Sequence, residues 1–376
     1  MRVSSQQTSM SHLIMNKTLL LALGLAGLCG LARAQEIQKE PVDTKALRAC
    51  LFLLDVELRV RCFDEASGKN PVVQHSPAVA EAGTTGDDGQ FFKRNEEAKL
   101  SWLDRRWELL PTSKRGTFSV RPYQPVYVLP VYHNKSPNIR PTSPNPANTV
   151  QPGNAPESLD QNELKFQLSL KTKVMENMFG DNGDLWFGYT QSSRWQVMNE
   201  DISRPFRETN YEPEMIFTWR TSWSEFRDAT GWEPRLLGLS FNHQSNGRAL
   251  PLSRSWNRLI GMVGFERENT MVQFRPWLRI SEDAADDDNP DISDYVGRGD
   301  MLLVHKHNGH EYSLLARHNF RGGDQSRGAA QFDWAFPLTS NLRGHIQYFT
   351  GYGESLIDYN YKSDYLGIGF SLVGWY

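Results

Sequence analysis

The segment LKFQLSLK, residues 164 to 171, alternates strictly between apolar and polar side chains. Leucine and phenylalanine fill its even positions, whereas Lys165, Gln167, Ser169 and Lys171 fill the odd ones. Successive side chains of a β-strand point to opposite faces of the sheet, so this period of two predicts a strand with one apolar and one charged face.

The same alternation continues to the end of the chain. We count twelve candidate strands, which begin near residues 117, 162, 184, 209, 233, 256, 270, 297, 309, 328, 341 and 364. Tight turns at Glu268-Asn269, Asn308-Gly309 and Ser340-Asn341 alternate with long connections at the other ends of the strands, and the connection from about 222 to 232 is an exception. An even number of strands with short and long connections at opposite ends is typical of an outer-membrane barrel. The predicted fold class is therefore all-β, a 12-stranded antiparallel transmembrane β-barrel.

The last candidate strand favours closure of the sheet. Leu366, Ile368, Phe370 and Leu372 share one parity, and the chain ends on the aromatic Tyr376. So apolar an edge strand invites aggregation in a soluble sheet, whereas closure into a barrel removes the edge. Alternation alone leaves a soluble all-β sandwich open, since a sandwich also hides one apolar face.

Composition excludes two other classes of protein. The 376 residues carry 41 basic and 44 acidic side chains, a formal net charge of -3. No overall positive field exists to hold a nucleic-acid backbone, so we expect no nucleic-acid partner. The mean hydropathy is -0.55, and no uninterrupted apolar run of about 18 residues follows the leader, which argues against a helical membrane protein. A barrel is compatible with this average because only alternate residues meet lipid.

The N-terminal part of the chain is expected to differ from the barrel. Residues 1–34 are interpreted as a signal peptide, with an apolar core and an Ala-Arg-Ala cleavage signature. Residues 35–116 are expected to form a small helical or disordered periplasmic extension, and residues 117–376 the barrel. Cys50 and Cys62 are a candidate disulfide, which an exported protein permits; the alternative is two buried free thiols in a small helical element.

The densest cluster of reactive side chains is FNHQSNGRALPLSRSWNR, residues 241 to 258. His243 and Ser245 share the parity of leucine and phenylalanine on their strand, and Asn257 does so on the next. This is the lipid face of a barrel, where polar groups are costly. A hairpin folded about position 250 would pair His243 with Asn257 and keep Ser245 on the same face. A nucleophile, a general base and a group that orients its imidazole would thereby come together.

The same cluster also has a purely structural interpretation, as hydrogen-bonded groups at the rim of a pore. The alternative function is then a non-enzymatic outer-membrane pore or structural barrel. Its lumen residues, such as Lys165, Asp333 and Arg343, would line a channel or close it with ion pairs. The acidic run from Glu282 to Asp288 lacks the glycine and the spacing of an EF-hand loop and is interpreted as a solvated outer loop.

Five segments make a family resemblance specific. They are SRPFRETNYEPE (203–214), NHQSNGR (242–248), SRSWNR (253–258), DDNPDI (287–292) and GYGESLIDYNY (351–361). They resemble segments of the bacterial outer-membrane phospholipase A family, and the resemblance covers roughly residues 117 to 376. It implies a lipolytic serine hydrolase with Ser245 as nucleophile, His243 as base and Asn257 as the orienting group. It also implies calcium-dependent hydrolysis of phospholipid acyl esters, with A1, A2 and lysophospholipase activity.

The resemblance further implies a Ca2+ cofactor at the interface of a reversible, activating homodimer. The ligands would be the backbone carbonyl of Arg248, the hydroxyl of Ser253 and the hydroxyl of Ser203 from the partner chain. Better-known members of the family carry an acidic residue at the position of Leu250, where it belongs to a second site in the monomer. We therefore expect no strong calcium site in the isolated monomer.

Gln191 is the candidate dimer-interface residue. It has the parity of Leu185, Phe187 and Tyr189, on a face that should meet lipid. Near a two-fold axis its amide would bond to the partner copy, and the alternative is that it reaches interfacial water. With a periplasmic N-terminus, the hairpin at 241–258 turns at the outer surface, so the active site is expected at the outer leaflet of the bacterial outer membrane.

Overall fold

The fold is that of a computed structural model, which describes residue 50, residues 100–151, residue 153 and residues 157–375. The chain divides into two compact units, Met1–Thr85 and Gly86–Tyr376, and the second contains the barrel. Cys50 is disulfide-bonded. Its predicted partner Cys62 and the predicted signal peptide lie outside the described residues.

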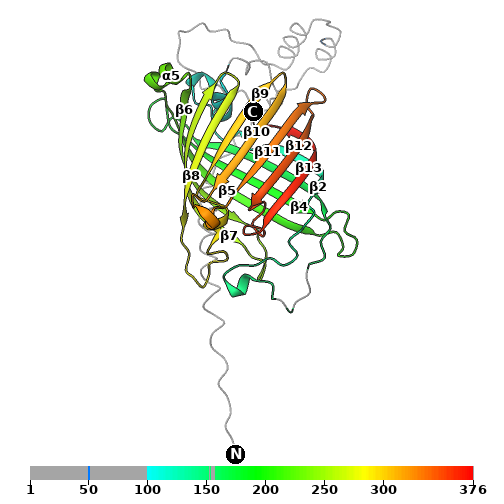
Figure 1. The fold of residues 1–376 in the computed structure, drawn as a ribbon. Helices are drawn as coiled ribbons and strands as arrows, with labels where there is room; N and C mark the ends of the chain where they lie inside the picture. The colour runs from blue at the N-terminus through cyan, green and yellow to red at the C-terminus, as the bar shows by residue number, and fades with distance from the viewer. Residues whose placement is uncertain (1–49, 51–99, 152, 154–156, 376) are drawn as a thin grey trace, which may run out of the picture. The chain divides into compact units, whose positions relative to one another are not determined.

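Thirteen antiparallel strands form the framework of the second unit (Figure 1). The strands are β1 (Val120–Pro122), β2 (Val126–His133), β3 (Asn162–Met175), β4 (Asp184–Trp195), β5 (Phe206–Arg220), β6 (Glu233–Ser245), β7 (Ser255–Arg267), β8 (Thr270–Ile280), β9 (Gly299–His307), β10 (His310–His318), β11 (Gly328–Pro337), β12 (Arg343–Tyr352) and β13 (Lys362–Val373). The short helices are α4 (Trp102–Trp107), α5 (Ser224–Thr230) and α6 (Ile292–Tyr295), with 3-10 turns η3 (Pro111–Ser113), η4 (Pro146–Asn148) and η5 (Gly323–Gln325). Among the described residues, no helix has the length and apolar character needed to cross a membrane.

The sheet closes on itself. From β2 to β13 each strand pairs with its neighbour in sequence, and β13 pairs back with β2. β1 and β2 lie along the same edge of β3, with Val120 opposite Thr172 and Tyr127 opposite Gln167, so together they form one interrupted strand. The predicted 12-stranded barrel is thus confirmed, and each predicted strand start lies within about three residues of an observed one.

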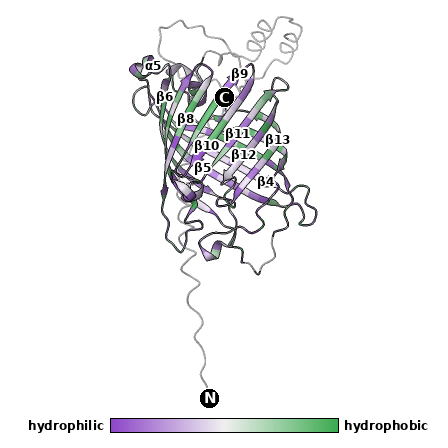
Figure 2. Cartoon of the chain, viewed as in Figure 1, coloured by the Kyte–Doolittle hydropathy of each residue, from purple (hydrophilic) through white to green (hydrophobic). Residues whose placement is uncertain are grey.

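The two faces of the wall differ as the period of two predicts. Apolar side chains such as Leu168, Leu239 and Phe241 point outward and are exposed, whereas Lys171 and Lys173 point inward and are buried. Figure 2 shows the resulting alternation of hydrophobic and hydrophilic positions along the strands. The outer face meets hydrocarbon in a membrane, where closure of the sheet lets neighbouring strands pair the backbone groups that lipid cannot.

Residues 100 to 116, expected in the extension, pack against the inner wall of the barrel. Ser101 caps α4 by accepting the Asp104 N–H on its Oγ. Trp102, Leu103, Trp107 and Leu109 are buried in a cluster with inward-facing residues of the wall, including Trp186, Ile216 and Leu236. These aromatic and leucine side chains stand among charged residues without a clear period, which is why the sequence alone suggests a linker.

Candidate active site

The hairpin of β6 and β7 carries the predicted catalytic residues. His243 lies directly opposite Asn257, and Ser245 lies opposite Ser255. Alternation keeps His243 and Ser245 on the outer face of β6, next to Phe241, which is 48% exposed. The predicted cross-strand pair is therefore observed.

A buried asparagine holds the loop between these two strands. The Asn246 side chain accepts the Arg254 N–H at 2.9 Å and donates to the Leu252 carbonyl at 2.9 Å. Its backbone N–H also donates to the Arg254 carbonyl at 3.0 Å. Gly247 follows with a φ of +62°, a conformation that favours glycine. These bonds fix the chain directly after Ser245 and shape the loop that contains Arg248 and Ser253.

The imidazole of His243 is held in one tautomer. Its Nδ1 lies 2.9 Å from Oδ1 of Asn257. An amide oxygen can only accept, so Nδ1 carries a hydrogen, and in the neutral imidazole Nε2 then keeps its lone pair. A neutral imidazole in this state can accept a proton at Nε2.

The Asn257 amide is itself oriented by an acidic residue. Its Nδ2 donates to Oε1 of Glu282 at 3.0 Å. Because a carboxylate oxygen only accepts, this bond assigns the nitrogen to the Glu282 side and the oxygen to the His243 side. Burial raises the pKa of the Glu282 carboxyl, and the hydrogen bond from Asn257 opposes part of that rise.

A second group of oxygen atoms lies beside the hairpin loop. A cavity of about 360 Å³ is lined by Arg248, Ser253, Asp286 and Asp288 together with neighbouring loop residues. The Ser253 hydroxyl donates to Oδ2 of Asp288 at 2.7 Å, and Asn148 donates to Oδ1 of the same carboxylate at 2.9 Å. Hydroxyl, carbonyl and carboxylate oxygens are the ligands that Ca2+ prefers. No group of three or more His, Cys, Asp or Glu side chains suited to a metal occurs in the described part of the chain.

The acidic run of the 281–298 connection is not simply solvated. Asp287 is buried and accepts from Arg279 at 2.6 Å, Asp288 binds Ser253, and Glu282 binds Asn257. Sequence reasoning missed these roles. The signal that could have found Glu282 is the tight turn at Glu268-Asn269, because that turn pairs Asn257 with Ile280, two residues before Glu282.

The remaining predicted residues lie on neighbouring strands and loops. Ser203 is exposed in the connection between β4 and β5, with a φ of +60°. Gln191 lies on the outer face of β4, where Tyr189 donates to its Oε1 at 3.1 Å. These positions put Gln191 on the lipid face of β4 and Ser203 on a surface loop beyond the same strand.

The family model and the relatives that match this chain all point to one family. Residues 103–372 match the family model described as Phospholipase A1. A putative phospholipase A1 of Neisseria meningitidis is 42% identical over 275 residues, which cover 71% of this chain and 69% of the relative. A phospholipase A1 of Escherichia coli is 38% identical over 216 residues, 57% of this chain and 71% of the relative.

Solved structures agree with the fold. The outer membrane phospholipase A from Escherichia coli superposes with a TM-score of 0.60 at 32% identity, over 68% of this chain and 95% of that one. The outer membrane phospholipase of Salmonella typhi, described as a dimer with bound calcium, gives a TM-score of 0.60 at 34% identity, over 70% and 95% of the two chains. A further Escherichia coli structure is described as an active-site mutant in which an asparagine is replaced by alanine; its TM-score is 0.59 at 32% identity, over 70% and 95% of the two chains.

Proposed function

The chain belongs to the phospholipase A1 family and is a phospholipase of the bacterial outer membrane, and we propose that its hydrolysis runs through Ser245, His243 and Asn257. The hydrogen bond of 2.9 Å between His243 Nδ1 and Asn257 Oδ1, on the lipid face of one hairpin, is the observation that carries the proposal. Polar side chains on the lipid face cost free energy, so their presence there favours a functional role. On this face these side chains can contact the acyl ester of a phospholipid that remains in the membrane.

The proposed reaction uses the free Nε2 of His243. Ser245 Oγ attacks the ester carbonyl while Nε2 takes its proton. The imidazolium then gives that proton to the departing lysophospholipid oxygen, which leaves an acyl group on Ser245. Water, activated by the same nitrogen, hydrolyses the acyl-enzyme and releases a fatty acid. Asn257 keeps the ring in one orientation throughout. The A1, A2 and lysophospholipase activities are all ester cleavages of this kind.

We propose that the reaction depends on calcium. The Arg248 carbonyl and the Ser253 hydroxyl would hold the ion, with Ser203 of a partner copy completing the site in a reversible, activating homodimer. The oxygen-lined cavity beside Ser253 supports this choice, as does the related Salmonella typhi dimer with bound calcium. Bound Ca2+ would supply positive charge near the oxygen of the ester carbonyl. Leu250 offers no ligand, so we expect weak calcium binding in the monomer.

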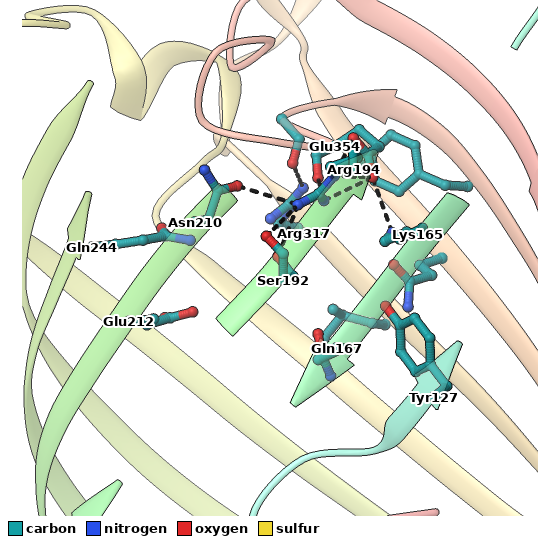
Figure 3. Close-up of a pocket in the computed structure, with 15 residues that line it drawn as sticks. Tyr127, Lys165, Gln167, Ser192, Arg194, Asn210, Glu212, Gln244, Arg317 and Glu354 are labelled. Carbon is teal, nitrogen blue, oxygen red and sulfur yellow. Dashed lines mark hydrogen bonds and ion pairs between the residues drawn. The ribbon is translucent and has the colours of Figure 1, made fainter. Parts of the chain in front are cut away.

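A non-enzymatic pore is disfavoured by the contents of the lumen. Glu354, from the connection between β12 and β13, binds Lys165 at 2.9 Å and Arg194 at 2.8 Å. Figure 3 shows these two cations turned toward Glu354 from neighbouring strands. A cavity of about 130 Å³ lies beside them. Lys165, one of the predicted lumen residues, is thus held in a buried ion pair, which favours a closed lumen over an open channel.

Fatty-acid release from mixed phospholipid–detergent micelles tests this function. We expect the purified full-length protein to release fatty acid with millimolar calcium and to stop when EDTA is in excess. Ser253→Ala should need several times more calcium for half-maximal rate, because it removes one ligand. Ser326→Ala, which removes a hydroxyl from a distant loop, is the matched control. An unchanged rate in EDTA would contradict the calcium role, and no release under any condition would contradict the proposed reaction.

A further inference from the structure

Glu282 extends the proposed triad by one side chain. It follows β8, whose last residue Ile280 pairs with Asn257. Its Oε1 accepts from Asn257 Nδ2 at 3.0 Å, and Asn257 Oδ1 lies 2.9 Å from His243 Nδ1. Side chains from β6, from β7 and from the connection after β8 thus form one hydrogen-bonded row behind the proposed nucleophile.

The first consequence of this row is orientation. Without Glu282, the Asn257 amide can turn over and present its nitrogen to His243. Nδ1 would then have to accept, and the ring hydrogen would move to Nε2. Nε2 is the atom that must take the proton of Ser245, so the turned amide would favour a tautomer that cannot act as the base.

The second consequence is charge. When His243 takes the proton it becomes an imidazolium, and a neutral asparagine offers it no negative charge. Glu282 supplies that charge on the far side of the amide. Donation of an N–H to a carboxylate also polarises the amide and makes Oδ1 a stronger acceptor.

We propose that Glu282 is a positioning residue of this active site, which orients the Asn257 amide and supplies the negative charge that asparagine lacks. This inference rests on the proposed roles of Ser245, His243 and Asn257. The other charged groups near Glu282 have partners of their own: Arg279 binds Asp287 at 2.6 Å, and Asp288 binds Ser253 at 2.7 Å. Neither bond involves Glu282, so a substitution of Glu282 leaves both groups paired.

The test measures kcat and KM on micelles for variants of the purified full-length protein, with folding checked by heat-dependent gel mobility. We expect Glu282→Ala to lower kcat about tenfold with KM unchanged, the effect of losing a charged hydrogen-bond partner. Glu282→Gln keeps an acceptor and should lose less. Asp283→Asn removes an exposed carboxylate from the next position in the chain and should stay within about twofold of wild type.

The pH profile separates charge from structure. Without the carboxylate, protonated His243 is less stabilised, so the imidazole becomes neutral at lower pH. We therefore expect the acid limb of the kcat/KM profile of Glu282→Gln to move to lower pH, although its kcat is reduced. A general loss of packing would lower the rate without moving this limb.

Double variants show whether Glu282 acts through Asn257. If it does, Glu282→Ala combined with Asn257→Ala should have the rate of Asn257→Ala alone. Asn257→Asp would set two carboxylates against each other, so it should reduce the rate, and adding Glu282→Gln should restore part of it.

The possible results separate a failure of the role proposed for Glu282 from a failure of the proposed catalytic function. Wild-type kcat in both Glu282→Ala and Glu282→Gln, with Ser245→Ala inactive, would overturn the role of Glu282 and leave the triad intact. Equal losses in Asp283→Asn and Glu282→Gln would overturn it as well, because the effect would then belong to loop charge in general. Retained activity in Ser245→Ala would contradict the proposed function itself.

Discussion

At the scale of single residues, the proposed chemistry depends on which side chains occupy the outer face of β6 and β7. Parity alone predicts that His243 and Ser245 face lipid, and hairpin symmetry predicts that Asn257 lies opposite His243; the register agrees. Hairpin symmetry about the turn at Glu268-Asn269 places Asn257 opposite Ile280, but Glu282 lies two residues beyond the end of that strand, where parity no longer applies. Its contact with Asn257 depends on how the connection folds back.

The three proposed catalytic residues should differ in their importance. We expect Ser245→Ala and His243→Ala to lower kcat by about a thousandfold or more, since each removes a group that forms or breaks a bond. Asn257→Ala removes alignment but no reacting atom, so its rate should stay at least tenfold above that of Ser245→Ala.

Fatty-acid release from micelles measures this order, with heat-dependent gel mobility as the check on folding. Ser240→Ala, which removes an inward-facing hydroxyl from the same strand, serves as a control that should remain active. Equal losses in Ser245→Ala, His243→Ala and Asn257→Ala would contradict the assigned roles.

At the scale of elements, strands were predictable and their connections were not. The period of two repeats over many residues, so the predicted strand starts lie close to the observed ones. The burial of α4 was missed because its apolar residues are few and interspersed with charges. The connection 353–361 is also more than a surface loop: Leu356, Ile357, Asp358 and Tyr359 are buried with Glu354.

That connection should stabilise the barrel through its central carboxylate. Glu354→Gln removes the buried carboxylate that pairs with both Arg194 and Lys165, so we expect a loss of roughly 3 kcal/mol in the free energy of unfolding. Urea titration in detergent, followed by gel mobility, measures the loss. Asp324→Asn, an exposed change in another outer connection, should be neutral. Equal midpoints for Glu354→Gln and wild type would show that the ion pairs contribute nothing net.

At the scale of the whole molecule, the proposed active site lies on the outer wall of the barrel, so we expect the enzyme to act on lipid beside it rather than on solutes passing through it. Intact outer membranes have little phospholipid in the outer leaflet, so access to substrate can limit activity. A site shared between two copies would add a second control, since it is complete only when barrels associate.

The proposed homodimer predicts a role for Gln191. In a two-fold dimer its amide would bond across the interface, a gain of roughly 0.6 kcal/mol if it resembles polar pairs between membrane helices. Gln191→Ala should then weaken calcium-dependent crosslinking in detergent and lower activity. Tyr312→Phe, on the outer face of β10 half-way round the sheet, is the matched control. Undiminished dimer in Gln191→Ala would remove this residue from the interface, and a fully active monomer would contradict the dimer mechanism.

The central claim is that Ser245 is the nucleophile, and covalent labelling tests it most directly. The active protein is treated with a long-chain fluorophosphonate, which reacts with activated serines, and peptide mass spectrometry locates the adduct. We predict one adduct per chain, on Ser245, formed in step with loss of fatty-acid release and absent from Ser245→Ala. Inactivation with the adduct on another residue, or labelling that persists in Ser245→Ala, would contradict the account.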